Sequence, residues 1–321
     1  MSDAPGNVTA GKRKARATLA HRAEYYAMRG TIGALRALSW ESACRIGAKL
    51  GALGYRPLGI RKRVVERQIA AAFPAMSQEE VIGLARASYE HLGRSAIETA
   101  LLNSLGRDGI QRLVETVDGW ELIEEVMAAR KGAVLVTGHI GNWELAGAYV
   151  AARGIPLDAI VRGMANPLFD AYLNHTREEI GITVVHDSEA VRRTPRSLRG
   201  GRAVAFVADQ GVLGLASTFV PFFGRPAKTP RGAAVFALRF DVPVLFVVAL
   251  RKPNGCYRLV VERIETDKTG DKDRDVDAIV ARYTEHLEKW VRVVPAQYFW
   301  QHRRWRRQPP NTPPELRDPS A

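Results

Sequence analysis

The sequence predicts an α/β fold with a mixed, mostly parallel central sheet flanked by helices and preceded by an N-terminal helical arm. From about residue 131, short apolar runs rich in β-branched residues alternate with helical stretches, as in parallel sheets. Residues 18–106 are instead rich in Ala, Leu, Arg and Glu, with apolar residues at helical spacing. Hydrophobic residues at 46% and charged residues at 25% are typical of a globular protein.

The chain divides into four parts on this basis. Residues 1–17 are polar and basic and predict a disordered tail, and residues 309–321 are proline-rich and predict a second one. Between them lie the helical arm, residues 18–106, and the α/β domain, residues 107–308. Apolar periodicity within the arm predicts three helices, over Ile32–Leu53, Val64–Phe73 and Gln78–Leu102.

Six apolar runs of the α/β domain are the predicted strands, and the last amphipathic stretch is a predicted helix. The strands are Ala133–Thr137, Leu157–Val161, Thr183–His186, Ala203–Ala208, Val242–Leu250 and Tyr257–Val261, and the helix is Asp275–Val293.

The formal charge of +13 predicts an anionic partner, which leaves nucleic acid, anionic lipid and an acidic carrier protein as candidates. Cys44 and Cys256 lie far apart without a C-x-x-C pattern, so no zinc site or disulfide framework is expected. We expect a reducing compartment, no metal and no cofactor.

No membrane span or signal peptide is expected. Apolar runs such as Val242–Leu250 are much shorter than the roughly 20 residues that cross a bilayer. The arm nevertheless repeats cations beside apolar faces, as at Arg45, Lys49 and Arg56, whose stems can snorkel along anionic lipid. The alternative is an ordinary helix whose charges lie in water.

The segment from Gly138 to Glu144 reads G-H-I-G-N-W-E and lies between a predicted strand and an apolar helix. If Asn142 caps that helix, Glu144 lies in its first turn and its carboxylate can reach back to His139. A histidine oriented by a carboxylate is a general base near neutral pH, as transfer of an acyl group to a hydroxyl requires. The alternative is a turn histidine bonded to backbone, with Glu144 interacting with the helix dipole.

Two further segments carry polar residues at the ends of predicted elements. Asp209 directly follows the strand Ala203–Ala208, so it lies at the same rim as His139 if the two strands are parallel neighbours. Thr229 is the predicted N-cap of the helix Ala233–Arg239, and cations before this helix invite an anion. The alternative is a capped helix whose basic residues, Lys228 and Arg231, lie in water.

These segments together resemble the lipid A late acyltransferases, the lauroyl and myristoyl transferase family. The resemblance covers about residues 30–308. Besides the G-H-I-G-N-W-E segment, it rests on Arg162, Asn166-Pro167-Leu168, Arg177, Ala208-Asp209-Gln210-Gly211, Phe222-Phe223-Gly224, Thr229, Pro295-Ala296-Gln297-Tyr298, Trp300, His302, Arg303 and Arg304.

The resemblance implies a glycerolipid-acyltransferase-like fold and a role for each matching residue. His139 would be the general base and Glu144 its partner, and the substrate-binding residues would be Arg162, Arg177, Asp209, Gln210 and Thr229. Arg162 suits phosphate, because guanidinium groups bind phosphate bidentately. The alternative for Arg177 and Asp209 is a structural ion pair with each other.

We therefore expect residues 107–308 to move a fatty acyl chain from acyl-carrier protein or acyl-CoA to a hydroxyl of a membrane glycolipid or lysophospholipid. Residues 18–106 would be the membrane-associating arm, at the cytoplasmic face of the bacterial inner membrane, with peripheral or monotopic attachment. The family commonly has a hydrophobic N-terminal anchor, and this sequence does not show a clear one.

Two alternatives come from other functional classes. A nucleic-acid-binding protein would use the charge and the aromatic and basic C-terminal segment from Tyr298 to Arg307, but no RRM, KH or zinc-finger signature is present. A lipid or ester hydrolase would use the same His139 and Glu144 pair, without a G-x-S-x-G segment. No nucleic-acid partner is expected.

Overall fold

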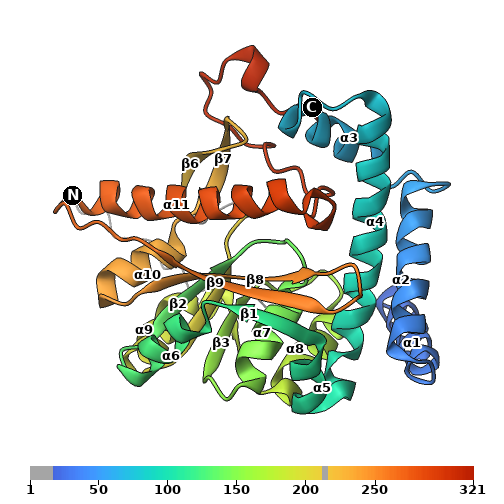
Figure 1. The fold of residues 1–321 in the computed structure, drawn as a ribbon, viewed down its shortest axis with the longest axis horizontal. Coiled ribbons are helices and arrows are strands. Elements are labelled where there is room, and N and C mark those ends of the chain that lie inside the picture. The colour runs from blue at the N-terminus through green and yellow to red at the C-terminus, as the bar shows by residue number, and fades with distance from the viewer. Residues whose placement is uncertain (1–16, 212–215) are drawn as a thin grey trace, which may run out of the picture.

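The computed structural model describes residues 17–211 and 216–321 and has a seven-stranded central sheet (Figure 1). The strand order is β1-β9-β8-β2-β5-β3-β4, with β8, β2, β5, β3 and β4 parallel to one another. β9 runs antiparallel to β8, and β1 is parallel to β9. The predicted mixed, mostly parallel α/β fold is therefore confirmed.

All six predicted strands are present, with ends shifted by at most a few residues. They are β2 (Ala133–Thr137), β3 (Leu157–Val161), β4 (Ile182–His186), β5 (Ala203–Val207), β8 (Val244–Arg251) and β9 (Tyr257–Ile264). Three other strands were not predicted: β1 (Val114–Asp118) and the antiparallel pair β6 (Ser217–Phe222) and β7 (Arg225–Pro230). β1 and β7 lack a continuous apolar run, and Pro221 interrupts the apolar run of β6.

Helices cover both faces of the sheet, and alternate residues of each strand supply the two cores. In β2, Val134 and Val136 belong to one core, whereas Ala133 and Leu135 belong to the other. The helices of the α/β domain are α5 (Gly106–Leu113), α6 (Trp120–Ala128), α7 (Trp143–Ala152), α8 (Pro167–Ile180), α9 (Ala190–Arg199), α10 (Gly232–Phe240) and α11 (Lys272–Val293).

The arm consists of α1 (Leu19–Arg36), α2 (Trp40–Tyr55), α3 (Lys62–Ala72) and α4 (Gln78–Leu101), followed by the 3₁₀ turn Leu102–Leu105. The single helix predicted over Ile32–Leu53 is wrong, because the Ser39 side chain caps α2 and ends the continuity with α1. Figure 1 shows α4 against the α/β domain with α1 and α2 outside it. Val81, Ala85 and Tyr89 of α4 join the main core, so this helix is part of the globule.

The disordered tail predicted over residues 309–321 is not what the structure shows. This segment folds back on the domain, where the Arg225 guanidinium donates to the carbonyl of Glu315 and Arg303 pairs with Asp318. Proline content reduces the entropy that ordering removes, so a few polar anchors suffice to hold the segment. The other predicted tail, residues 1–17, lies outside the described residues except for Ala17.

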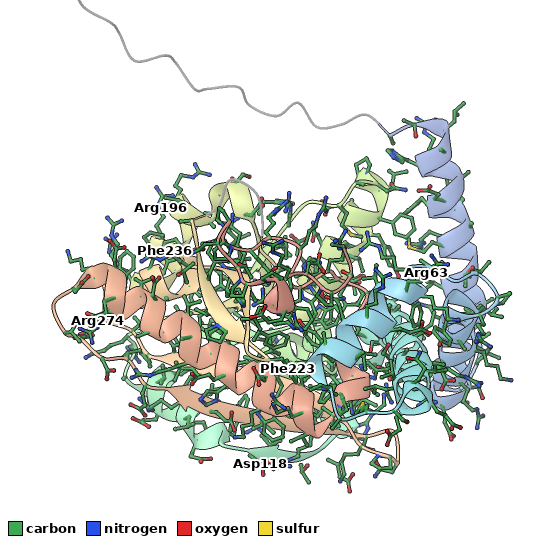
Figure 2. All side chains as sticks on the ribbon, turned by 90° about the horizontal axis from the view of Figure 1, so that it is seen from above. Arg63, Asp118, Arg196, Phe223, Phe236 and Arg274 are labelled. Carbon is green, nitrogen blue, oxygen red and sulfur yellow. The ribbon has the colours of Figure 1, made fainter. Side chains whose placement is uncertain are left out.

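Positive charge is spread over the outside of the molecule. Figure 2 shows the side chains of Arg63 on α3, Arg196 on α9 and Arg274 on α11 at separate places on the surface. None of the helices in residues 17–211 and 216–321 is long and apolar enough to cross a membrane.

Candidate active site

Two parallel neighbouring strands bring His139 and Asp209 to one rim of the sheet. β2 and β5 pair along their whole length, with Thr137 opposite Val207, and the two polar residues follow these strand ends. The expectation that both residues lie at the carboxyl edge is confirmed.

His139 and Asp209 contact each other directly. The Nδ1 atom of His139 lies 2.6 Å from Oδ1 of Asp209, and the backbone N–H of His139 donates to Oδ2 at 3.1 Å. Burial by itself raises the pKa of the Asp209 carboxyl, but the His139 imidazole and the Arg304 guanidinium outweigh burial and hold that pKa well below its ordinary value. The carboxylate therefore keeps the proton of His139 on Nδ1 and leaves Nε2 as the free basic nitrogen.

The prediction that Glu144 orients His139 is wrong. Both Glu144 oxygens accept hydrogen bonds from Arg177, at 3.0 Å from Nε and 2.6 Å from Nη2. Burial lowers the pKa of Arg177, and the contact with Glu144 more than restores it, so the pKa is raised overall. The predicted cap is present, since Asn142 accepts from the Leu145 N–H at 2.9 Å, but it directs Glu144 toward α8.

The alternative in which Arg177 and Asp209 form a structural ion pair is wrong as well. The expected pairs were His139 with Glu144 and Arg177 with Asp209. The observed pairs are His139 with Asp209 and Arg177 with Glu144. Sequence spacing favoured Glu144, the carboxylate nearest to His139 along the chain. In space, Asp209 at the end of the neighbouring strand is the one in contact with the imidazole.

The loop that carries His139 is fixed by backbone contacts with the C-terminal segment. The Gly141 N–H donates to the Gln297 carbonyl, and the Phe299 N–H donates to the His139 carbonyl, both at 2.9 Å. Gly141 has a φ of 59°, and a Cβ there would lie 2.0 Å from the Ala249 carbonyl oxygen, so only glycine fits. The P-A-Q-Y segment thus supports the candidate active site through its backbone.

Two aromatic rings flank the His139 imidazole. The Trp143 ring lies 4.8 Å from it and the Phe299 ring 5.8 Å, measured between ring centroids. Neither ring was given a site role from the sequence. The available signal was the position of Trp143 inside the G-H-I-G-N-W-E segment and of Phe299 between the matching residues Tyr298 and Trp300.

An apolar cavity of about 580 Å³ opens beside His139, within the range of roughly 300–1,000 Å³ common for ligand sites. β3 pairs with β5 only from Leu157 to Ala159, although it pairs with β4 along its whole length. The sheet therefore opens between the last residues of β3 and β5, and side chains of both, with those of α7 and α10, line the space.

Most of the predicted polar residues lie at or behind this cavity. His139, Glu144, Arg162, Arg177 and Gln210 line it. Asp209 lies behind His139 and is 3% exposed. Gln210 also lies beside the histidine, with Nε2 3.2 Å from Nδ1, but both nitrogens are donors when Nδ1 carries the proton shared with Asp209.

Thr229 is elsewhere, and its predicted role as an N-cap is wrong. The β6–β7 ladder extends to Pro230, which pairs with Ser217, so the chain is still extended at Thr229. α10 begins only at Gly232 and has Arg231 as its N-cap residue. The buried Thr229 hydroxyl instead accepts a hydrogen bond from Nη2 of Arg304 at 2.7 Å.

No group of three or more His, Cys, Asp or Glu side chains in the described ranges is arranged to hold a metal ion. Cys44 and Cys256 are free thiols.

A mostly parallel sheet with a histidine–carboxylate pair at its carboxyl rim, beside an apolar cavity, is an arrangement typical of α/β enzymes. A model of the bacterial lipid A biosynthesis acyltransferases matches residues 12–307, and the chain belongs to this family. It is an acyltransferase.

Curated relatives cover most of the chain. It is 28% identical to a lipid A biosynthesis lauroyltransferase of Escherichia coli (strain K12) over 286 residues. These residues cover 88% of this chain and 92% of the relative. A lipid A biosynthesis palmitoleoyltransferase of the same strain is 24% identical over 274 residues, 85% and 87% of the two chains. A phosphatidylinositol mannoside acyltransferase of Mycobacterium tuberculosis (strain ATCC 25618 / H37Rv) is 26% identical over 219 residues, 67% of each.

Proposed function

We propose that the protein transfers a fatty acyl chain from an acyl-carrier-protein or acyl-CoA thioester to a hydroxyl of a membrane glycolipid. The observation that carries the proposal is the His139–Asp209 pair at an apolar cavity of about 580 Å³. Such a cavity suits a hydrocarbon chain, and the adjacent imidazole suits a hydroxyl acceptor. The relatives' names supply the acceptor class, since lipid A and phosphatidylinositol mannosides are both glycolipids.

The proposed reaction needs one base and no covalent enzyme intermediate. Nε2 of His139 takes the proton of the acceptor hydroxyl as its oxygen attacks the thioester carbonyl carbon. The tetrahedral adduct collapses by breaking the carbon–sulfur bond, which forms the ester. The imidazolium then returns the proton to the departing thiolate, and Asp209 stabilises the imidazolium in between.

The other site residues have distinct parts in this proposal. Arg162 and Gln210, which line the cavity, would contact substrate. Arg177 acts through Glu144, because the two side chains neutralise each other on the cavity wall, with exposed side-chain fractions of 18% and 16%. Thr229 supports Arg304 and is a positioning residue.

The arm offers a surface for peripheral attachment, which we propose lies on the cytoplasmic face of the inner membrane. Ile46, Leu50 and Leu53 of α2 are exposed at helical spacing, and Leu58 and Ile60 after the helix are more exposed still, at 67% and 56%. Exposed cations flank these side chains, namely Arg45, Lys49 and Arg56. Apolar side chains bordered by cations favour an anionic lipid surface.

The test of the reaction is a product assay with the purified chain, a membrane lipid extract and labelled acyl-carrier-protein or acyl-CoA. We expect a labelled lipid ester with the wild type and a loss of about 10³-fold or more in His139→Ala. His175→Ala, at an exposed histidine of α8, is the matched control and should retain transfer. Undiminished transfer in His139→Ala would refute the mechanism. Release of free fatty acid without an ester product would favour a hydrolase.

The test of attachment is co-sedimentation with anionic phospholipid vesicles. Leu50→Glu with Leu53→Glu should weaken binding strongly, because two charges would enter the apolar layer. Val293→Glu, at an exposed residue of α11, should bind as the wild type does. Equal binding by all three proteins would show that α2 is not the attachment surface.

A further inference from the structure

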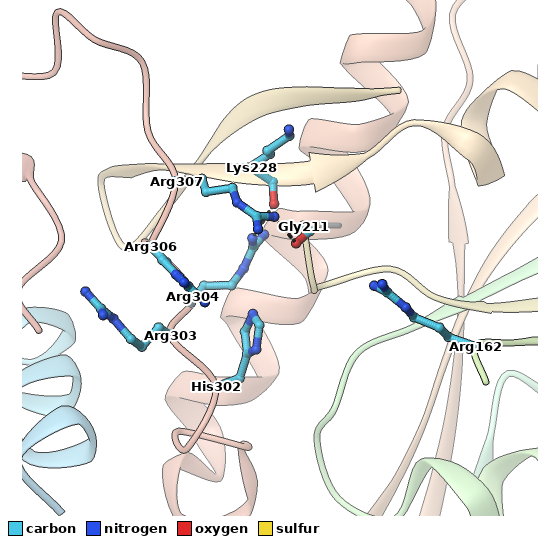
Figure 3. A pocket seen from close by; sticks show the side chains of 8 residues that line it. All are labelled: Arg162, Gly211, Lys228, His302, Arg303, Arg304, Arg306 and Arg307. Atoms are coloured by element: carbon cyan, nitrogen blue, oxygen red, sulfur yellow. Dashed lines mark hydrogen bonds between the residues drawn. The ribbon is translucent and has the colours of Figure 1, made fainter. Parts of the chain in front are cut away.

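A second cavity, of about 170 Å³, adjoins the apolar one and is lined almost entirely by cations (Figure 3). Arg162 lines both cavities, so the two are contiguous at this side chain. In Figure 3, Arg162 extends toward the pocket from one side, and Arg304, Arg306 and Arg307 come from the C-terminal segment on the other. Lys228 of β7, His302 and Arg303 complete the charged and polar lining.

Among the described residues, most of this charge has no counterion. Arg303 pairs with Asp318, but among the described residues no carboxylate lies within ion-pair distance of the other five cations. These are Arg162, Lys228, Arg304, Arg306 and Arg307. Asp209 acts on Arg304 from a longer range and is already bonded to His139. A cluster of this kind is unfavourable without an anion.

Arg304 is the clearest case, because its side chain is buried as well as unpaired. The residue is 3% exposed, and its guanidinium donates to the Lys228 carbonyl at 2.8 Å and to the Thr229 hydroxyl at 2.7 Å. Its Nε atom is buried and has no partner among the described residues. Burying a charge without a counterion is unfavourable, and a bound anion would offset that cost.

Hydrogen bonds within the protein hold the lining of the pocket in place. Arg304 ties the C-terminal segment to β7, and Nη1 of Arg307 donates to the Gly211 carbonyl at 3.2 Å. Burial lowers the pKa of His302 to about 4, with Asp209 opposing and Arg304 adding to the shift. His302 is therefore neutral at neutral pH and supplies polar ring atoms without further charge.

We infer that this pocket, beside the apolar cavity, is a binding site for a phosphate monoester. The residues that would hold it are Arg162, Lys228, Arg304, Arg306 and Arg307. A monoester carries about −1.5 to −2 charges near neutral pH and has three acceptor oxygens, which suits several converging donors better than a singly charged diester does. The source of the phosphate rests on the proposed function: it is either the headgroup of the lipid acceptor or the 3′-phosphate of CoA.

The binding test uses inorganic phosphate as the probe, titrated calorimetrically into the full-length chain at physiological ionic strength. We expect saturable binding by the wild type and a dissociation constant raised about tenfold or more in the Lys228→Gln, Arg306→Gln double variant. Arg306 is exposed and unpaired, so its replacement should not disturb folding. Arg274→Gln, at an exposed arginine outside the pocket, removes charge as a control and should bind normally (Figure 2).

Absence of saturable phosphate binding by the wild type would overturn the inference, and so would equal binding by the double variant. The phosphate-binding measurement needs no enzymatic activity. Phosphate binding that is lost in the variant therefore stands even if no acyl transfer is found, which would refute only the proposed function.

Inhibition kinetics identify the source of the phosphate. With an acyl-CoA donor and a phosphorylated glycolipid acceptor, inorganic phosphate should compete with the acceptor if the headgroup occupies the pocket, and with acyl-CoA if the 3′-phosphate does. The double variant should raise the KM for that same substrate and leave the other KM unchanged. Competition with neither substrate would overturn the inference.

Discussion

At the scale of single residues, the partner of His139 is decided by the strand next to it. Asp209 lies 70 positions along the chain and still makes two hydrogen bonds to His139, whereas Glu144, within the same motif, is occupied by Arg177. The residue that sets the imidazole tautomer is thus predicted to be Asp209.

Asp209→Asn should lower kcat by about 10³ to 10⁴-fold with little change in KM. The amide would donate to Nδ1 and move the ring proton to Nε2, which removes the free basic nitrogen. Steady-state kinetics of acyl transfer measure this. Asp118→Asn, on the edge strand β1, is the control and should retain kcat. A loss confined to KM would show that Asp209 binds substrate rather than orienting the base.

His91 predicts an acid-sensitive fold. Its ring Nε2 donates to the Gly141 carbonyl at 3.0 Å, and burial lowers its pKa from 6.5 to about 4, with Arg251 and Arg94 adding to the shift against that hydrogen bond. Between pH 6.5 and about 4 the unfolded chain binds a proton that the folded chain excludes. Stability is therefore lost as pH falls through this window.

The measurement is the urea midpoint of unfolding at pH 7 and pH 5. It should fall in the wild type and fall less in His91→Gln, which keeps a donor but does not titrate. His175→Gln, at a surface histidine, should behave as the wild type does. The same fall of the urea midpoint between pH 7 and pH 5 in all three proteins would contradict the prediction. The midpoint should still fall somewhat in His91→Gln, because the pKa of His302 is lowered too.

At the scale of elements, α2 and α4 pack with their backbones in contact. A Cβ at Gly51 would lie 2.0 Å from the Tyr89 carbonyl oxygen, and one at Gly93 would lie 2.1 Å from the Gly47 carbonyl oxygen. The glycines of α2 therefore allow α2 to lie directly against α4. Other residues of α4 pack into the main core.

Gly51→Ala should destabilise the protein by about 1–3 kcal/mol, because the two helices would have to separate. Gly83→Ala is the matched control on α4, where a Cβ meets nothing within 4 Å. It should be neutral or stabilising by up to about 1 kcal/mol, since alanine favours helix. Urea unfolding measures both. Equal free energies of unfolding would mean that the close packing carries little of the stability.

At the scale of the whole molecule, one buried carboxylate joins the arm, the motif loop and the sheet. Glu98 of α4 forms an ion pair with Arg251 of β8, accepts from Asn142 at 3.0 Å and accepts from the Tyr257 hydroxyl of β9. Glu98 is fully buried, and the Arg251 side chain is 9% exposed. Asn142 is also the cap of α7, so this contact connects the arm to the position of the candidate active site.

Glu98→Gln should cost about 3–5 kcal/mol of unfolding free energy, because it leaves the buried Arg251 without a counterion. It should also lower kcat, since glutamine has one acceptor oxygen in place of the two that served Arg251 and Asn142, and the position of Asn142 is no longer fixed as before. Glu41→Gln breaks an exposed pair with Arg45 and should change stability little. Chemical unfolding and the acyl-transfer assay measure the two effects. A stable, fully active Glu98→Gln would show that the network does not couple the arm to the site.

Sequence by itself determined the features that local patterns encode. Apolar runs located β2, β3, β4, β5, β8 and β9, because burial of a strand in a parallel sheet requires a continuous apolar segment. The rim position of His139 and Asp209 followed from the strands that precede them. Strands β1 and β7 lack such runs and Pro221 interrupts that of β6, so all three were missed. The capping residue Ser39 separates two helices that periodicity alone had joined.

Only the tertiary structure decided which charges pair. Glu144 is nearer to His139 in sequence, but helix α7 points it at Arg177, and the register of β2 with β5 places Asp209 against the imidazole. The cation pocket has the same origin, since Arg162, Lys228 and Arg304 come from segments far apart in the chain. Local patterns record burial and helix ends, whereas ion pairs between elements depend on distances that exist only once the sheet has formed.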